Sequence, residues 1–229
     1  METMKQVQNI ERFHQLRSEK VMVTFHVKKT KNCTHLNEWL SAQTELTNIE
    51  TAIIDMALER YEQQADGWNE EELKMNFISH ILSVANPNIT SVCKIFFERP
   101  LSGIVNNYEL NVITDCFVAS YDGAGLPLNP YFFLQEFKQS QRFGKSDPQG
   151  QMLAAMLLAQ QINNDKKPLY GCYVIERNWF FTTLKGLDYC VSQQFNSTNK
   201  ADLLQIVYIL RKLKELILGR TETVISAQK

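Results

Sequence analysis

The sequence predicts an α/β fold, in which a mixed β-sheet is flanked by helices and preceded by a mainly helical extension. Three observations support this prediction. The chain contains β-rich runs bounded by turn-forming residues, and it contains amphipathic stretches with apolar residues at helical spacing. From residue 67 onward these segments follow the order α, β, β, β, α, β, β, α. Such an order is typical of a mixed sheet covered by helices.

The first 66 residues (1–66) are expected to form the helical extension. Residues 2–20 have helical character, residues 21–27 alternate loosely like a short strand, and residues 28–31 are predicted to be a basic turn. The strongest helix prediction covers residues 44–64, where Ile and Leu recur at helical spacing. This apolar face requires a partner, which we expect to be the rest of the chain or a second copy of it.

The following domain (67–229) is expected to begin with a helix capped by Asn69. Three glutamates occupy the first turn of this helix, where the helix dipole favours negative charge. Leu and Ile recur behind them and form the buried stripe of the helix. Three strands are predicted next, at residues 93–104 (interrupted by Pro100), 108–119 and 131–139.

A second core helix is expected to begin at Asp147 and Pro148, because Asp is favoured at the cap and Pro at the first helical position. It is predicted to run to about Asn163. Further β-rich runs and a final amphipathic helix follow, at residues 170–175, 179–184, 187–195 and 200–218.

The composition limits the class of protein. Hydrophobic residues make up 44 % of the 229 residues, which is enough to form a core. No apolar run approaches the roughly 18 residues of a membrane span, and the N-terminus lacks the apolar region of a signal peptide. We therefore expect a cytoplasmic protein without a membrane partner.

The cysteines and histidines show no pattern of metal ligands. The five cysteines are scattered, odd in number and without a CxxC motif, which favours a reduced chain over a disulfide framework or a zinc site. The four histidines are also scattered. An enzyme with a cysteine or histidine nucleophile has no supporting constellation here.

The net charge of −1 differs from the basic surplus that is common in dedicated nucleic-acid binders. Any attraction for phosphate must therefore come from local basic runs. The run of Lys138, Arg142 and Lys145 is the most interesting, because it directly follows an acidic residue in a predicted strand. The alternative is that each basic run is simply a solvated surface.

In the segment YFFLQEFKQS (131–140), a run of apolar and aromatic residues is interrupted by Glu136 and Lys138. Residues two apart point to the same face of a strand, so the two charges should project side by side. Burying either charge alone is costly. A buried pair of this kind is tolerated when the two charges form an ion pair with each other, or when they bind a metal or a substrate. A structural ion pair between Glu136 and Lys138 is the simplest alternative.

A second acid, Asp115, lies in the preceding predicted strand. The segment between the strands, YDGAGLPLNP (121–130), is rich in Gly, Pro and Asn and is predicted to be a loop. Antiparallel pairing of the two strands would bring Asp115 and Glu136 together beside Lys138. Carboxylates are preferred ligands of Mg²⁺, with water and substrate phosphate as the other ligands.

Asp115, followed by Glu136, Phe137 and Lys138 on the next strand, resembles the motif of the PD-(D/E)XK nuclease superfamily. Thr114 stands where that family has a proline. The fold implied by the resemblance is the restriction-endonuclease-like fold.

Two flanking segments extend the resemblance. WNEEELKMNFISHIL (68–82) is similar to the first core helix of the family, which often carries a further acid. DPQGQMLAAMLLAQ (147–160) is similar to the helix after the third strand, which often carries a glutamine. The match runs from residue 68 to residue 217, roughly two thirds of the chain.

The resemblance implies a metal-dependent nuclease that acts on DNA or RNA, with DNA favoured. Asp115, Glu136 and the carbonyl group of Phe137 would hold Mg²⁺ or Mn²⁺, and Lys138 would assist the attacking water. Cleavage of both strands would favour a homodimer. The alternative is that the fold serves as a binding or assembly module whose nuclease activity is weak or lost.

Two further site residues are expected from the flanking helices. Glu70 falls on the inward face at the start of its helix, and a capping role is the alternative. Gln151 lies just ahead of the apolar run of the second helix and is preferred to Gln149 as the glutamine of the family. The alternative for Gln151 is an exposed polar residue of the first helical turns.

Overall fold

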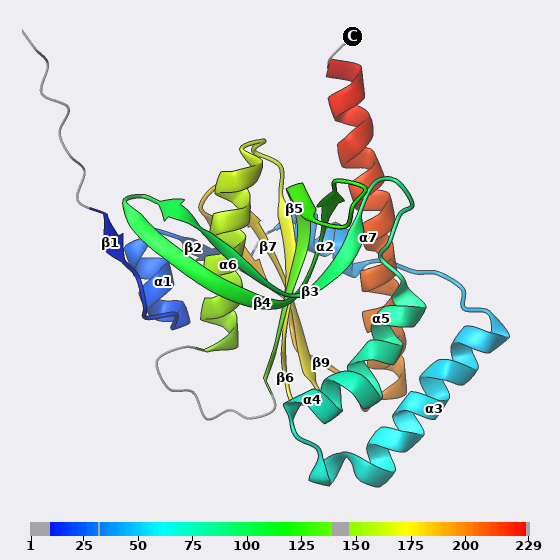
Figure 1. Ribbon diagram of the computed structural model, residues 1–229. Helices are drawn as coiled ribbons and strands as arrows, with labels where there is room; N and C mark the ends of the chain where they lie inside the picture. Colours follow the sequence, from blue (N-terminus) through cyan, green and yellow to red (C-terminus); the bar gives the residue numbers. More distant parts are fainter. Residues whose placement is uncertain (1–9, 32, 139–146, 228–229) are drawn as a thin grey trace, which may run out of the picture.

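The computed structural model describes residues 10–31, 33–138 and 147–227, with side chains described as far as Arg220. Within this part of the chain, nine strands form one mixed sheet in the order β1-β4-β5-β6-β7-β8-β2, with β3 beside β4 and β9 beside β7. Helices lie on both faces of the sheet (Figure 1). The predicted α/β class with a helix-flanked mixed sheet is confirmed.

The centre of the sheet begins with three long antiparallel strands, β3 (Lys94–Val105), β4 (Tyr108–Tyr121) and β5 (Pro127–Lys138). All three agree with the predicted strands to within a few residues. Asn106 and Asn107 turn the chain between β3 and β4, with φ angles of 47° and 68°. Pro100 does not interrupt β3, because within the described part of the chain this strand pairs with β4 alone, and proline is tolerated on an edge strand.

The second half of the sheet is built on β5. Strand β6 (Leu169–Ile175) lies parallel to β5, and β7 (Asn178–Lys185) lies antiparallel to β6. Strands β8 (Asp188–Val191) and β9 (Phe195–Asn196) both pair with β7. The predicted edge strand at 187–195 is thus divided into two short strands.

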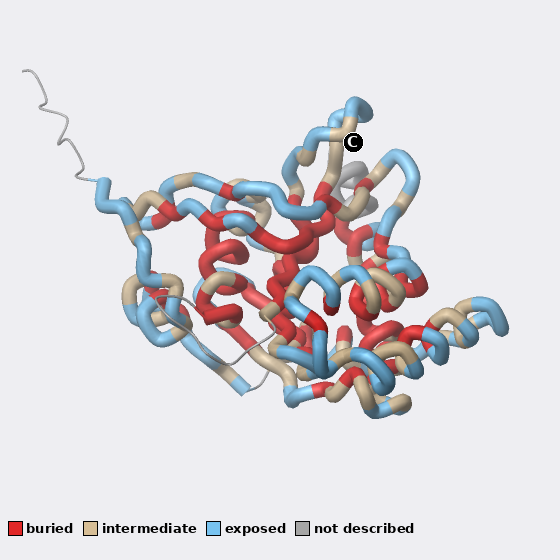
Figure 2. The backbone as a smooth tube through the Cα atoms, turned by 60° about the horizontal axis from the view of Figure 1, so that its bottom comes forward, coloured by how far each residue is buried: buried red, intermediate tan, exposed pale blue. Residues whose placement is uncertain are grey.

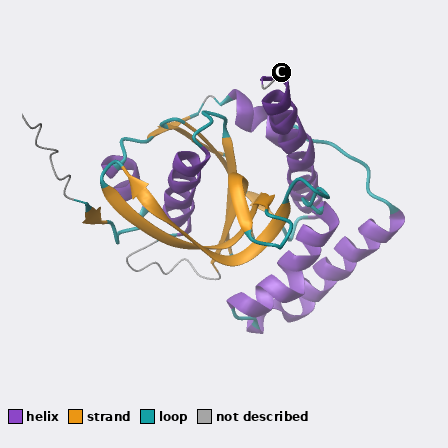
Figure 3. Ribbon diagram, turned by 45° about the horizontal axis from the view of Figure 1, so that its top comes forward, coloured by secondary structure: helices purple, strands orange, loops and turns teal. Residues whose placement is uncertain are grey.

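The sheet separates two clusters of buried side chains. Helix α6 (Pro148–Asn163) covers one face, whereas α5 (Ser79–Ala85) and α7 (Lys200–Ala227) cover the other (Figures 1 and 3). Asp147 caps α6 as expected, since its Oδ1 accepts a hydrogen bond of 2.7 Å from the N–H group of Gly150. Buried residues are concentrated in the central strands and α6 (Figure 2).

The N-terminal segment corrects three predictions. Helix α1 (Ser18–Thr24) occupies most of the range predicted as a strand, and strand β2 (Lys28–Thr30) replaces the predicted basic turn. Residues 10–17 contain the short strand β1 (Glu11–Arg12) rather than the end of a helix, and residues 1–9 lie outside the described residues. The reason is tertiary, because α1 packs on α6 while β1 and β2 pair with β4 and β8.

The remaining elements before the core are α2 (Thr34–Leu40), α3 (Asn48–Gln64) and the 3-10 turn η1 (Ala65–Gly67). Helix α3 starts later than predicted, because Thr47 and Glu50 form a capping box at its N-terminus. Its apolar face packs on the rest of the chain, as expected, and residues on both sides of position 66 share one cluster of buried side chains. The division after residue 66 stays a prediction.

A disulfide bond joins Cys33 to Cys190, whose Cα atoms are 6.3 Å apart. The prediction of a fully reduced chain is therefore wrong for this pair, whereas Cys93, Cys116 and Cys172 are free and buried. The 157-residue separation of the pair leaves no motif in the sequence. Only the pairing of β2 with β8, which places Thr30 opposite Cys190, brings the two cysteines together.

No helix in the described ranges is long and apolar enough to cross a membrane.

Candidate functional site

One wall of the candidate site is a helix that changes its geometry along its length. It begins with α4 (Glu70–Leu73), continues as the π-helical turn η2 (Lys74–Ile78), and ends as α5. Asn69 caps it as predicted, because Asn69 and Glu72 form a capping box. Single π-turns within helices are frequent at functional sites. This one carries Lys74, which contacts strand β4.

The second wall is the ladder between β4 and β5. Cys116 pairs with Gln135, so Asp115 and Glu136 lie at neighbouring positions of the two strands. Asp115 Oδ2 accepts a hydrogen bond of 2.7 Å from the N–H group of Phe137. Both acids are buried, with exposed fractions of 9 % for Asp115 and 1 % for Glu136. The structure therefore brings the two predicted carboxylates to one place.

Glu136 is buried at the site but lacks a full set of hydrogen-bond partners among the described residues. Its Oε1 atom is buried and has no hydrogen-bond partner among the described residues. Burial, and then the charge of Asp115, raise the pKa of Glu136 well above its ordinary value, and the charges of Lys138 and Lys74 oppose this only in part. A buried carboxyl oxygen without a partner calls for a proton or a cation.

The raised pKa predicts a pH dependence of stability. Above the ordinary pKa of 4.5, the folded chain keeps a proton on Glu136 that the unfolded chain releases. The free energy of unfolding therefore falls as the pH rises through this window, up to the raised pKa of the folded state. Glu136→Gln has no carboxyl group at this position and should not show this fall. The difference in free energy of unfolding between the variant and the parent protein should therefore increase with pH, in favour of the variant.

Urea unfolding at several pH values, with a chelator present, measures this difference. Glu62→Gln is the matched control, because Glu62 is exposed, and it should keep the parental profile. Parallel profiles for the parent and Glu136→Gln would show that Glu136 is already ionised in the folded chain.

Lys74 is the hub of the site, although the sequence reasoning did not select it. Its Nζ atom lies 2.8 Å from Asp115, 2.9 Å from Glu71, 3.3 Å from Glu98 and 3.5 Å from Glu70. Burial alone lowers the pKa of Lys74, but the hydrogen bonds to Asp115 and Glu71 outweigh it, and the pKa is raised above its ordinary value. The i to i+4 spacing of Glu70 and Lys74, which favours an ion pair on one face of a helix, could have indicated Lys74 from the sequence.

Lys138 pairs with Glu70 rather than with Glu136. Its Nζ atom lies 3.3 Å from Glu70 Oε1, and both side chains are 32 % exposed. No ion pair joins Lys138 to Asp115 or Glu136 within the part of the chain that the structure describes. The alternative of a structural Glu136–Lys138 ion pair is therefore wrong, and Glu70 connects Lys138 to Lys74.

The structure does not bring Gln151 into this cluster. Its half-buried side chain lies in the first turns of α6, and its N–H group donates to the carbonyl group of Asp147. Its side chain forms no hydrogen bond with another candidate residue in the described ranges. Arg142 and Lys145, from the basic run, lie outside the described residues.

The donor set suits a hard cation only in part. Among the described residues, no group of three or more His, Cys, Asp or Glu side chains is arranged to hold a metal ion. The candidate donors are carboxylate and carbonyl oxygens, as Mg²⁺ prefers, and Glu136 has an oxygen without a partner. Lys74, however, already holds Asp115 Oδ1. The residues fit Mg²⁺ or Mn²⁺ if the ammonium group leaves that oxygen.

One hollow borders the cluster, and a second lies near the β6–β7 turn. The first, of about 360 Å³, is mainly apolar and is lined by residues of η2, α5, β3 and β5 together with Asp115. The second, of about 340 Å³, lies between η1 and the turn that joins β6 to β7.

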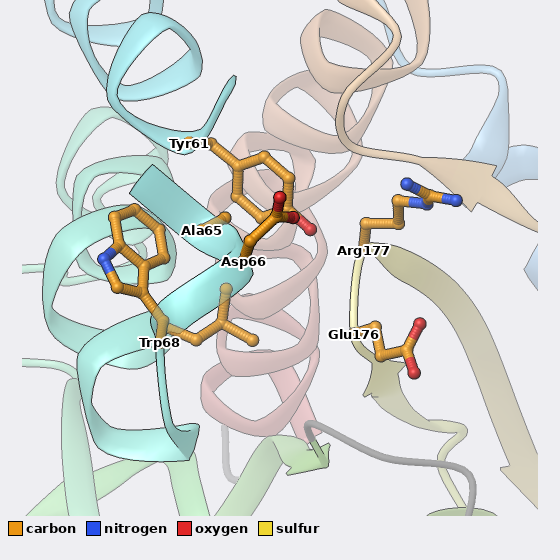
Figure 4. Close-up of a pocket in the computed structure, with 7 residues that line it drawn as sticks. Tyr61, Ala65, Asp66, Trp68, Glu176 and Arg177 are labelled. Atoms are coloured by element: carbon orange, nitrogen blue, oxygen red, sulfur yellow. The ribbon is translucent and has the colours of Figure 1, made fainter. Parts of the chain in front are cut away.

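Figure 4 shows this second hollow, with Tyr61 and Asp66 on one side and Glu176 and Arg177 on the other. The N–H group of Glu176 donates a hydrogen bond of 2.7 Å to the carbonyl group of Lys138. The β6–β7 turn is thus anchored to the last residue of β5. This contact places the exposed Arg177 at the same end of the sheet as Lys138.

A scan against models of known protein families finds no match to the chain, and no curated protein is detectably similar to it.

Proposed function

We propose that the chain is a metal-dependent phosphodiester hydrolase of the PD-(D/E)XK nuclease type, acting on DNA in preference to RNA. The observation that supports this most is the buried Glu136 carboxyl group, which lies beside Asp115 and has an oxygen without a hydrogen-bond partner among the described residues. Two carboxylates at such close range repel each other when both are ionised. A divalent cation held by these carboxylates would offset this repulsion and would give the Glu136 oxygen a partner.

The residues have distinct roles in this proposal. Asp115, Glu136 and the carbonyl group of Phe137 would hold Mg²⁺ or Mn²⁺, and the bound cation would supply Lewis-acid polarisation of the phosphate and a lowered pKa of water. Lys138 orients the attacking water and offsets negative charge that develops on the phosphate. Glu70 holds the Lys138 ammonium group in position through their 3.3 Å contact. Arg177 offers an exposed cation to a neighbouring backbone phosphate.

The contacts of Lys74 favour a second candidate function. Its ammonium group already contacts Asp115 Oδ1, which a metal would need, and it offsets part of the negative charge of the surrounding acids without a metal ion. A chain that keeps this arrangement would be a binding or assembly module of the same fold, with weak or lost activity. The two candidates differ in whether a divalent cation displaces Lys74 from Asp115.

A cleavage assay tests the proposal. The full chain is incubated with Mg²⁺ or Mn²⁺ and with single- and double-stranded DNA and RNA, beside Lys138→Ala and a chelator control. We expect cation-dependent cleavage that is lost in Lys138→Ala, and faster cleavage of DNA than of RNA. No cleavage of any substrate, together with no Mn²⁺ binding by calorimetry, would favour the binding module. A homodimer stays a prediction for cleavage of both strands.

A further inference from the structure

The apolar hollow beside Asp115 has no role in the chemistry described above. Its floor is formed by the buried side chains of Ile78, Leu82 and Phe137, and Phe97 and Met75 stand at its rim. We refer to it as the Phe97 pocket. Its volume of about 360 Å³ lies within the range of small-ligand sites, roughly 300–1,000 Å³. Asp115 and Lys74 line both this pocket and the candidate site.

The rim of the Phe97 pocket exposes large apolar side chains. Phe97 is 54 % exposed and Met75 is 69 % exposed, although both lie next to a buried core. A cluster of exposed apolar side chains around a hollow is a feature of binding sites. An aromatic ring and a thioether are also the side chains that best contact a flat aromatic ligand.

Two irregularities of the backbone produce this rim. Met75 lies in the π-helical turn η2. Glu98 has a φ angle of 48° and leaves the β3–β4 ladder between the pairs Phe97–Cys116 and Arg99–Thr114. A non-glycine residue at positive φ is strained, and such strain is concentrated at functional sites. Both irregularities thus lie at the pocket, one on each of its walls.

We propose that the Phe97 pocket takes one unpaired nucleobase of a nucleic acid whose phosphate would be bound through the divalent cation at Asp115 and Glu136, an inference that rests on the proposed function. A nucleobase has two flat apolar faces, which suit Phe97, Met75 and the floor of the pocket. In a duplex these faces are covered by the neighbouring bases, so only an unpaired base can enter. The chain should therefore prefer single strands, or flip one base out of a duplex.

The charges around the pocket also favour a base over other occupants. Glu71 and Glu98 line the pocket together with Asp115. Three carboxylates around one ammonium group repel a phosphate, which excludes the nucleic-acid backbone from the pocket itself. Carboxylate oxygens do accept hydrogen bonds from the N–H groups of a base edge. The backbone phosphate is left outside, where Lys138 and Arg177 lie.

The test is a binding experiment that requires no cleavage. The full chain is titrated, with Ca²⁺ present, into a fluorescein-labelled single-stranded oligonucleotide, the same strand in abasic form, and the matching duplex. We expect Phe97→Ala to weaken binding of the intact single strand by about 5- to 150-fold, the range that stacking of one base on an aromatic side chain contributes. Phe97→Trp should bind at least as well as the parent.

Two controls make the result specific. Ile49→Ala removes another exposed apolar side chain, on α3, and should leave binding unchanged. The abasic strand should bind the parent and Phe97→Ala equally. Because Phe97 is exposed, Phe97→Ala should keep the melting temperature of the parent. A duplex that binds as tightly as the single strand and loses affinity in Phe97→Ala would identify a flipped base as the occupant.

The outcomes separate the inference from the proposed function. Unchanged binding in Phe97→Ala, or an equal loss for intact and abasic strands, would overturn the inference and leave the nuclease proposal standing. If the parent chain binds no oligonucleotide of any kind, both are overturned.

Discussion

Lys138→Arg is expected to lower the turnover of a nucleic acid by about 100- to 1,000-fold, the usual effect of losing one stabiliser of transition-state charge. Lys138 is half-buried, and its ammonium group lies 3.3 Å from Glu70. Arginine keeps the charge and this ion pair, but its guanidinium group is bulkier, planar and does not release a proton. Metal binding, nucleic-acid binding and the melting temperature should therefore change little.

Turnover and melting temperature are measured on the same sample of Lys138→Arg. Lys212→Arg is the matched control, because Lys212 is exposed to a similar extent and also pairs with a glutamate, Glu215 on α7. It should retain full turnover. Undiminished cleavage by Lys138→Arg would remove Lys138 from the mechanism, and a large drop in its melting temperature would assign Lys138 a structural role.

Lys74→Met is expected to lower the free energy of unfolding by roughly 3 kcal/mol when no divalent cation is present, which is the lower end of the cost of breaking a buried ion pair. The Lys74 and Asp115 side chains are only 15 % and 10 % exposed, so Asp115 loses its main partner in a poorly solvated place. A divalent cation can replace the lost ammonium group. Mn²⁺ or Mg²⁺ should therefore restore stability to Lys74→Met more than to the parent.

Chemical unfolding with and without Mn²⁺ measures both effects. A cation at 100 times its dissociation constant stabilises the folded state by about 2.7 kcal/mol. The double variant Lys74→Met/Asp115→Asn is the control. It removes both charges, so it should be less destabilised than Lys74→Met and should not respond to Mn²⁺. An equal response of the parent and Lys74→Met would show that Lys74 does not compete with the metal, and no response in either would favour the binding module.

The sequence was sufficient where a signal is local. The capping residues Asn69 and Asp147 determine helix starts through side-chain hydrogen bonds within three residues, and the structure has both. The long strands β4 and β5 are flanked by turn residues and have strong β-propensity, so their pairing was predictable. The register that places Asp115 beside Glu136 was not predictable in the same way, because irregularities between Val118 and Ser120 shift the pairing from Tyr121–Pro127 near the loop to Cys116–Gln135 at the site.

The tertiary structure alone decided which charges pair and which short segments join the sheet. Lys138 pairs with Glu70, and Lys74 with Asp115, because a π-helical turn and a strand 41 residues away meet at one place. Strand β2, helix α1 and the Cys33–Cys190 disulfide likewise depend on partners far along the chain. Short segments have weak intrinsic preferences, and long-range burial and pairing outweigh them. The residue types at the acidic cluster were therefore readable from the sequence, whereas its geometry was not.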